Sequence, residues 1–115
     1  MDIPTDSRAR TTLEWLIARG AELRERVRRV ERNLRRTQQA LKYDPEFDGV
    51  MIENAQILVS IVNAARRELA HLDRALARLA AGAFASCEHC GDDIAESRIV
   101  AIPYATACRS CRPEV

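Results

Sequence analysis

Two apolar stripes, each advancing along the chain in alternating steps of three and four residues, constrain the fold of this 115-residue chain more than any other feature. This spacing places one residue in every three or four on the same side of a helix, as in the a and d positions of a coiled coil. The first stripe consists of Leu13, Leu16, Gly20, Leu23, Val27, Val30, Leu34, Thr37 and Leu41. The second consists of Met51, Ala55, Leu58, Val62, Ala65, Leu69, Leu72, Leu76 and Leu79. The sequence therefore predicts two long helices that pack along these stripes.

The segment between the stripes predicts that the helices fold back on each other. It contains Pro45, which cannot continue a helix, and Gly49, which tolerates a turn conformation. The mirrored spacing sets an antiparallel register in which Leu23 lies opposite Leu69 and Val30 opposite Val62. Residues 1–82 are accordingly expected to form an antiparallel coiled-coil hairpin.

Charge is distributed unevenly along the predicted hairpin. The chain has a net charge of only +1, which argues against a general nucleic-acid coat protein. Residues 8–42, however, carry eleven Lys and Arg against four Glu. The predicted tip, residues 44–53, instead carries only acidic charges: Asp44, Glu46, Asp48 and Glu53. Turn and cap chemistry accounts for single acidic residues such as Asp48 but leaves this concentration of four unexplained.

The sequence offers no signal for a membrane or secreted protein. It has no run of 18 apolar residues, and its N-terminus lacks the basic start and apolar stretch of a signal peptide. We therefore expect a cytoplasmic protein, in a reducing compartment where disulfides are disfavoured.

The last part of the chain contains all four cysteines, spaced Cys-x2-Cys-x17-Cys-x2-Cys at Cys87, Cys90, Cys108 and Cys111. This spacing is typical of a four-thiolate structural zinc site, whereas the alternative of two disulfides conflicts with a reducing compartment. His89 lies inside the first pair, and we expect it to face solvent because four sulfurs already complete a tetrahedron. Such a closed site leaves no position for a reactive water, and no other catalytic arrangement is present, so an enzyme is not expected.

The predicted fold class is thus mainly α: a long antiparallel coiled-coil hairpin followed by a small four-Cys zinc finger at residues 83–115. Within the finger, the cysteine pairs are accompanied by Gly91, Ile94, Arg98 and Pro103. With this spacing the segment resembles the zinc-finger signature of the DksA/TraR family, and the hairpin resembles the coiled coil of that family in architecture.

The resemblance implies a function. It implies a regulator that binds bacterial RNA polymerase directly, without contacting DNA, and inserts its coiled-coil tip through the secondary channel to modulate initiation. The tip residues that would act at the polymerase active centre are Asp44, Glu46, Phe47 and Asp48. A monomer with one zinc ion is expected.

The chain also departs from the family pattern. Its tip aspartates are four residues apart and the tip ends in Gly49, whereas the DksA tip resembles Asp-x-x-Asp-x-Ala. Only four residues follow Cys111, so the C-terminal helix that contributes to guanosine tetraphosphate binding in DksA is missing, and binding of this nucleotide is not carried over. Two alternatives remain open: a zinc ribbon that binds nucleic acid through the Arg-rich helix, and a coiled-coil adaptor for another protein.

Overall fold

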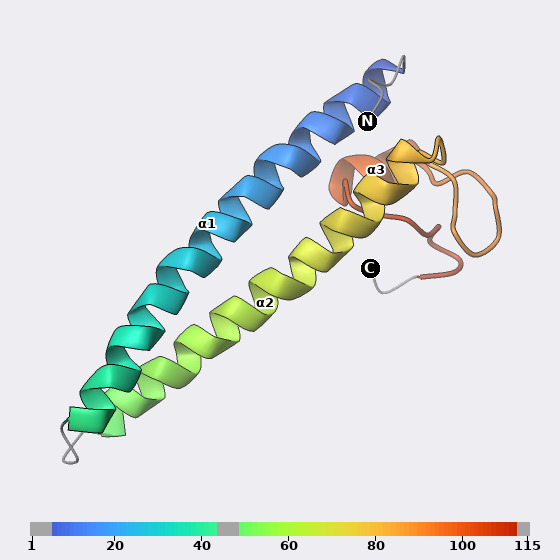
Figure 1. The fold of residues 1–115 in the computed structure, drawn as a ribbon. Coiled ribbons are helices and arrows are strands. Elements are labelled where there is room, and N and C mark those ends of the chain that lie inside the picture. Colours follow the sequence, from blue (N-terminus) through green and yellow to red (C-terminus); the bar gives the residue numbers. More distant parts are fainter. Residues whose placement is uncertain (1–5, 44–48, 113–115) are drawn as a thin grey trace. The chain divides into compact units, whose positions relative to one another are not determined.

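The computed structural model describes residues 6–43 and 49–112, and most of these residues are helical. Two long helices, α1 (Ser7–Tyr43) and α2 (Gly49–Ala80), form a helical hairpin, and the short α3 (Glu96–Ala101) lies within the cysteine-containing segment (Figure 1). Extended pairing in the described residues is confined to an isolated antiparallel bridge between Ser86 and Asp93. The predicted fold class is confirmed. The predicted tip residues Asp44, Glu46, Phe47 and Asp48 lie outside the described residues.

Local hydrogen bonds explain where α1 begins and where α2 ends. Asp6 precedes α1, and its Oδ1 accepts a hydrogen bond from the backbone N–H of Arg8 at 2.9 Å, which satisfies a free first-turn amide. At the end of α2, the N–H groups of Gly82 and Ala83 donate to the carbonyls of Leu79 and Arg78, at 3.1 and 2.9 Å. This is a Schellman arrangement, and it requires the positive φ of 76° that Gly82 adopts without steric cost.

The chain divides into two compact units. The finger unit comprises Met1–Gly20 and Ala70–Val115, and the hairpin unit comprises Ala21–Leu69. Each unit therefore contains a part of both long helices. The expected domain boundary between residues 82 and 83 stays a prediction, because compactness does not establish which segment folds independently.

In the hairpin unit, the core follows the predicted stripes. Leu23, Val62 and Ala65 are buried, with exposed fractions of 1, 7 and 3%. Burial decreases toward the end of the hairpin, where Leu41 and Met51 are 39 and 44% exposed. A groove of about 340 Å³ there is lined by residues that the expected register places near one another, Leu34, Thr37, Gln38, Leu41, Ile52, Ala55, Gln56 and Val59.

In the finger unit, the helix ends are buried on a wider face than the stripes predict. Leu16, Leu72 and Leu79 are buried as expected, but so are Thr12 and Ala75, which belong to neither stripe. The reason is that the cysteine-containing segment covers the two helices here as a third layer. Thr12 and Ala75 line a small cavity together with residues of that segment, namely Phe84, Ile99, Pro103 and Ala105. Leu13 and Leu76, which belong to the stripes, are only half-buried.

Neither long helix, within residues 6–43 and 49–112, has a segment apolar enough to cross a membrane.

Candidate metal centre

The first cysteine pair lies on a tight turn. The N–H of Gly91 donates to the carbonyl of Cys87 at 3.0 Å, and the N–H of Cys87 donates to the carbonyl of Asp92 at 2.8 Å. Gly91 adopts a φ of 79°, a conformation in which a side chain is disfavoured. The turn brings Cys87 and Cys90 to the same side, and we call residues 86–93 the first knuckle.

The second cysteine pair lies on a similar turn. The N–H groups of Cys111 and Arg112 both donate to the carbonyl of Cys108, at 3.1 and 3.0 Å. We call residues 107–112 the second knuckle. Just before it, the carbonyl of Thr106 accepts a hydrogen bond from the N–H of Glu88 at 2.8 Å, which brings the two turns together.

The two knuckles gather all four sulfur atoms into one cluster. The Sγ atoms of Cys87, Cys90, Cys108 and Cys111 all lie within 4.8 Å of one another. The Sγ atoms of Cys90 and Cys108 are 3.7 Å apart. A tetrahedron with Zn–S bonds of about 2.3 Å has sulfur–sulfur edges of about 3.8 Å, whereas a disulfide bond measures about 2.05 Å. The donor set and its spacing therefore fit one zinc ion.

Hydrogen bonds within the cluster shift the pKa values of its thiols. Hydrogen bonding, above all from the backbone N–H of Cys108, lowers the pKa of Cys87 to about 5. The neighbouring sulfurs, first that of Cys108 and then that of Cys87, raise the pKa of Cys111 to about 12. Neighbouring sulfurs therefore shift one another's pKa in opposite directions. A bound divalent cation removes this difference, because each ligand sulfur must be deprotonated.

The site has the character of a structural centre. Cys87 is 3% exposed and forms an apolar core with Ile94, Ile99 and Ala107. Four sulfurs complete the coordination of zinc, so no position remains for a reactive water. His89 does not belong to the cluster: its ring is 49% exposed, and its Nε2 lies 3.6 Å from a carboxylate oxygen of Glu88. The expectation that His89 faces solvent agrees with this placement.

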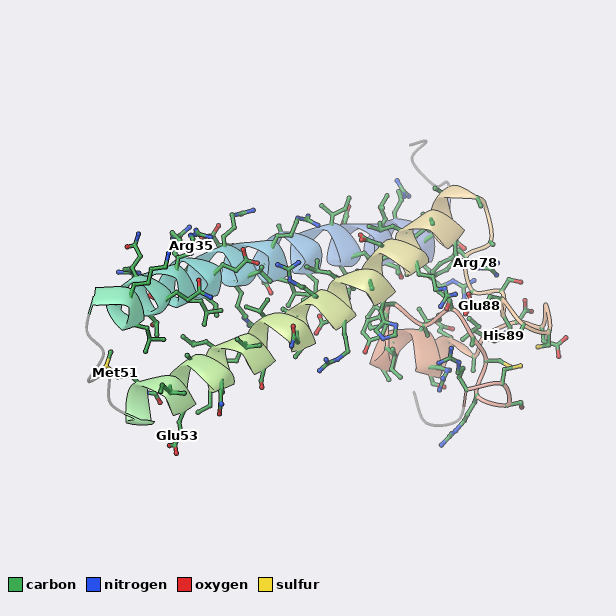
Figure 2. All side chains as sticks on the ribbon, turned by 60° about the horizontal axis from the view of Figure 1, so that its bottom comes forward. Arg35, Met51, Glu53, Arg78, Glu88 and His89 are labelled. Atoms are coloured by element: carbon green, nitrogen blue, oxygen red, sulfur yellow. The ribbon has the colours of Figure 1, made fainter. Side chains whose placement is uncertain are left out.

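Two arginines of α2 contact the first knuckle, a role that the sequence does not predict. Arg78, on the last turn of α2, donates from Nη2 to the carbonyl of Ser86 at 2.8 Å, directly before Cys87. One turn earlier, Nε of Arg74 lies 3.2 Å from Oε2 of Glu88. Figure 2 shows Arg78 on α2 beside the segment that carries Glu88 and His89. The four-residue spacing of Arg74 and Arg78 is the signal that places both on one side of the helix.

Comparison with known proteins identifies the family. Residues 82–114 match the model of the prokaryotic dksA/traR C4-type zinc finger, which includes both cysteine pairs. An uncharacterized protein of Aquifex aeolicus (strain VF5) is 34% identical over 101 residues, which cover 81% of this chain and 70% of the relative. The chain belongs to the DksA/TraR family. The resemblance seen in the sequence is thereby confirmed.

The fold of this DksA/TraR family member is also similar to a solved structure. The transcription factor DksA2 from Pseudomonas aeruginosa matches with a TM-score of 0.77, covering 95% of this chain and 83% of that chain at 22% sequence identity. This likeness concerns the fold. Together with the C4-type finger and the clustered sulfurs, it confirms a helical hairpin joined to a finger with one structural zinc.

Proposed function

We propose that this protein regulates transcription by binding bacterial RNA polymerase directly, with the end of its hairpin directed through the secondary channel toward the active centre. The observation that carries the proposal is membership of the DksA/TraR family, established through the four-Cys finger. The long two-helix hairpin supports it, because two helices are narrow enough to enter a channel that a globular domain cannot enter.

The charges of the hairpin unit suit a protein partner. Between residues 21 and 43, α1 carries eight Lys and Arg but only three Glu. Glu25 pairs with Arg28 of the same helix at 2.8 Å, whereas Glu31 pairs with Arg66 of α2. Arg35 is exposed on the surface of α1 (Figure 2). On α2, residues 49–65 carry a single charge, at Glu53. One helix thus offers cations to an acidic protein surface, while the other is nearly neutral.

The action at the active centre is assigned to the tip. Carboxylates are preferred ligands of Mg²⁺, and Asp44, Glu46 and Asp48 would supply them beside the apolar ring of Phe47. In this proposal the protein acts in the cytoplasm as a monomer, modulates initiation, catalyses no reaction and makes no contact with DNA.

Direct binding to core RNA polymerase tests the proposal. We expect the zinc-loaded protein to bind the core enzyme in a titration, and Arg35→Glu to weaken this affinity severalfold by replacing a cation of α1 with an anion. Arg67→Glu, an equal charge change at an exposed position of α2, is the matched control and should have less effect.

Two results would contradict the proposal. Absence of polymerase binding together with a mobility shift of DNA that falls steeply with salt would indicate a nucleic-acid-binding zinc ribbon. Absence of both would leave an adaptor for a different protein as the better account.

A further inference from the structure

The two knuckles are attached to the rest of the finger in different ways. The two ends of the first knuckle are paired with each other in the Ser86–Asp93 bridge, which includes the 2.7 Å hydrogen bond from the N–H of Ile94 to the carbonyl of Ala85. The N–H of Ser86 also donates to the carbonyl of Ala83 at 3.2 Å. The carbonyl of Ser86 is also held by Arg78 of α2. Several independent contacts therefore fix Cys87 and Cys90.

The second knuckle has fewer anchors: the hydrogen bond from Glu88 to Thr106 lies just before it, Ala107 packs in the apolar core, and a single side chain bonds both of its ends. Among the described residues, and apart from contacts with the cysteine sulfurs, Arg98 supplies the hydrogen bonds that join residues 107–112 to the rest of the finger. Its Nε donates to the carbonyl of Ala107 at 3.0 Å, and its Nη2 donates to the carbonyl of Arg112 at 2.6 Å. These two carbonyls lie immediately before Cys108 and immediately after Cys111, so a single guanidinium spans both ends of the knuckle.

The base from which Arg98 acts is fixed. Arg98 lies on α3, and the next residue, Ile99, is 9% exposed in the apolar core that also contains Cys87 and Ala107. Both hydrogen bonds of Arg98 are partly buried, where competition from water is reduced. The planar fork of a guanidinium can donate to two acceptors in a fixed geometry, which the single ammonium of Lys cannot reproduce.

We propose that Arg98 is a positioning residue that retains the zinc ion by holding the second knuckle closed. A tetrahedrally coordinated zinc ion is released when one pair of its ligands moves away from the other pair. Cys108 and Cys111 are the pair whose turn has fewer contacts with the rest of the finger. Arg98 opposes this movement by tying both ends of the knuckle to α3. The role concerns metal retention and stands whether or not the protein binds RNA polymerase.

The rate of zinc transfer from the full-length protein to an excess of a chromogenic chelator tests this role. Removal of a residue that orients metal ligands typically weakens metal binding about 10- to 100-fold, and we expect Arg98→Met to accelerate zinc loss by a factor in that range. Met keeps the length of the side chain but removes every donor. Arg98→Lys keeps the charge but has only one donor nitrogen. Its rate of zinc loss should lie between the rates of Arg98→Met and the parent.

The matched control is Arg109→Met. Arg109 lies between Cys108 and Cys111, is exposed, and has no hydrogen bond or ion pair among the described residues. Loss of its charge should change the rate by less than about threefold if retention comes from the hydrogen bonds rather than from the field of a nearby cation. Equal acceleration by Arg98→Met and Arg109→Met, or a rate for Arg98→Met within twofold of the parent, would overturn the proposal.

Two further measurements separate retention from general damage to the finger. Helix content by circular dichroism and the visible spectrum of the Co²⁺-substituted protein should match the parent, since the four sulfurs are unchanged. If Arg98→Met loses either signal, Arg98→Lys decides: an intact spectrum with faster zinc loss supports the role, and an unchanged rate refutes it.

Discussion

Three of the described residues in the finger unit adopt a positive φ, and one of them is not glycine. Gly82 and Gly91 occupy this region at 76 and 79°, where the absence of a side chain removes the steric cost. Ala85 adopts a φ of 61°, although an alanine is disfavoured there. Its carbonyl accepts the 2.7 Å hydrogen bond from Ile94, and its neighbour Ser86 pairs with Asp93. The pairing that fixes the first knuckle therefore imposes strain at Ala85.

Replacing Ala85 with glycine should release this strain. A left-handed alanine costs about 1–2 kcal/mol, and the added freedom of glycine in the unfolded chain costs about 0.5–1 kcal/mol, so we expect a net gain of up to about 1.5 kcal/mol. Ala83→Gly, at a position without positive φ, should instead destabilise by about 0.5–1 kcal/mol. Hydrogen exchange at the Ile94 amide in the zinc-loaded protein reports both changes. Loss of protection in both variants would show that Ala85 is unstrained.

Also at the residue scale, the sequence predicts the metal ligands better than it predicts the residues that hold those ligands in place. The cysteines follow from spacing alone, because a Cys-x2-Cys turn presents both sulfurs to one ion whatever surrounds it. The roles of Arg74, Arg78 and Arg98 do not follow. Their acceptors are carbonyls or side chains of a loop, and a charged residue on a helix is indistinguishable in sequence from one that faces solvent.

At the scale of elements, the apolar stripes account for the core of the hairpin unit but not for all of the finger unit. Leu23 and Val62 belong to the stripes and are buried. The stripes are sufficient in this unit because, in a pair of helices, each helix is covered on only one side. They miss Thr12 and Ala75, which are buried where the finger adds a third layer. A heptad pattern contains no information about a layer contributed by an irregular segment of the chain.

Substitutions along the hairpin test the stripes directly. Leu23→Asp or Val62→Asp places a charge among apolar side chains at positions 1 and 7% exposed, and should destabilise the protein by more than about 3 kcal/mol. Arg28→Ala removes only an exposed ion pair with Glu25 and should change the unfolding free energy by less than about 0.5 kcal/mol. Urea unfolding followed by circular dichroism measures both. Aspartate variants that unfold like the parent would show that the helices pair through another face.

At the scale of the whole molecule, the proposed function assigns stability and effect to different segments. The helices are held by aliphatic burial, and the finger by four sulfurs around one metal ion. The acidic residues Asp44, Glu46 and Asp48 lie outside the described residues. If the tip acts as proposed, substitutions at Asp44 and Asp48 should change the effect on transcription without changing the folding of the described residues.

The last prediction concerns Asp44 and Asp48. If the hairpin and finger bind the polymerase and the tip acts at its active centre, Asp44→Asn with Asp48→Asn should keep the affinity within a fewfold. Two carboxylates contribute little to docking when they are solvent-exposed, a contribution of about 0–1 kcal/mol per pair. The effect on transcription should nevertheless disappear, because an amide is a much weaker ligand for a divalent cation than a carboxylate.

Asparagine is the informative substitution because its side-chain oxygen still accepts a backbone hydrogen bond, so turn and cap chemistry are kept. In vitro transcription on several promoters, a binding titration and circular dichroism on the same preparation make the comparison. Phe47→Ala is the companion variant: if the ring wedges against the polymerase, affinity itself should fall. A double Asn variant that regulates transcription as the parent does would remove the tip from the mechanism. The hairpin would then act by occupying the channel, since obstruction requires its two helices but not its carboxylates.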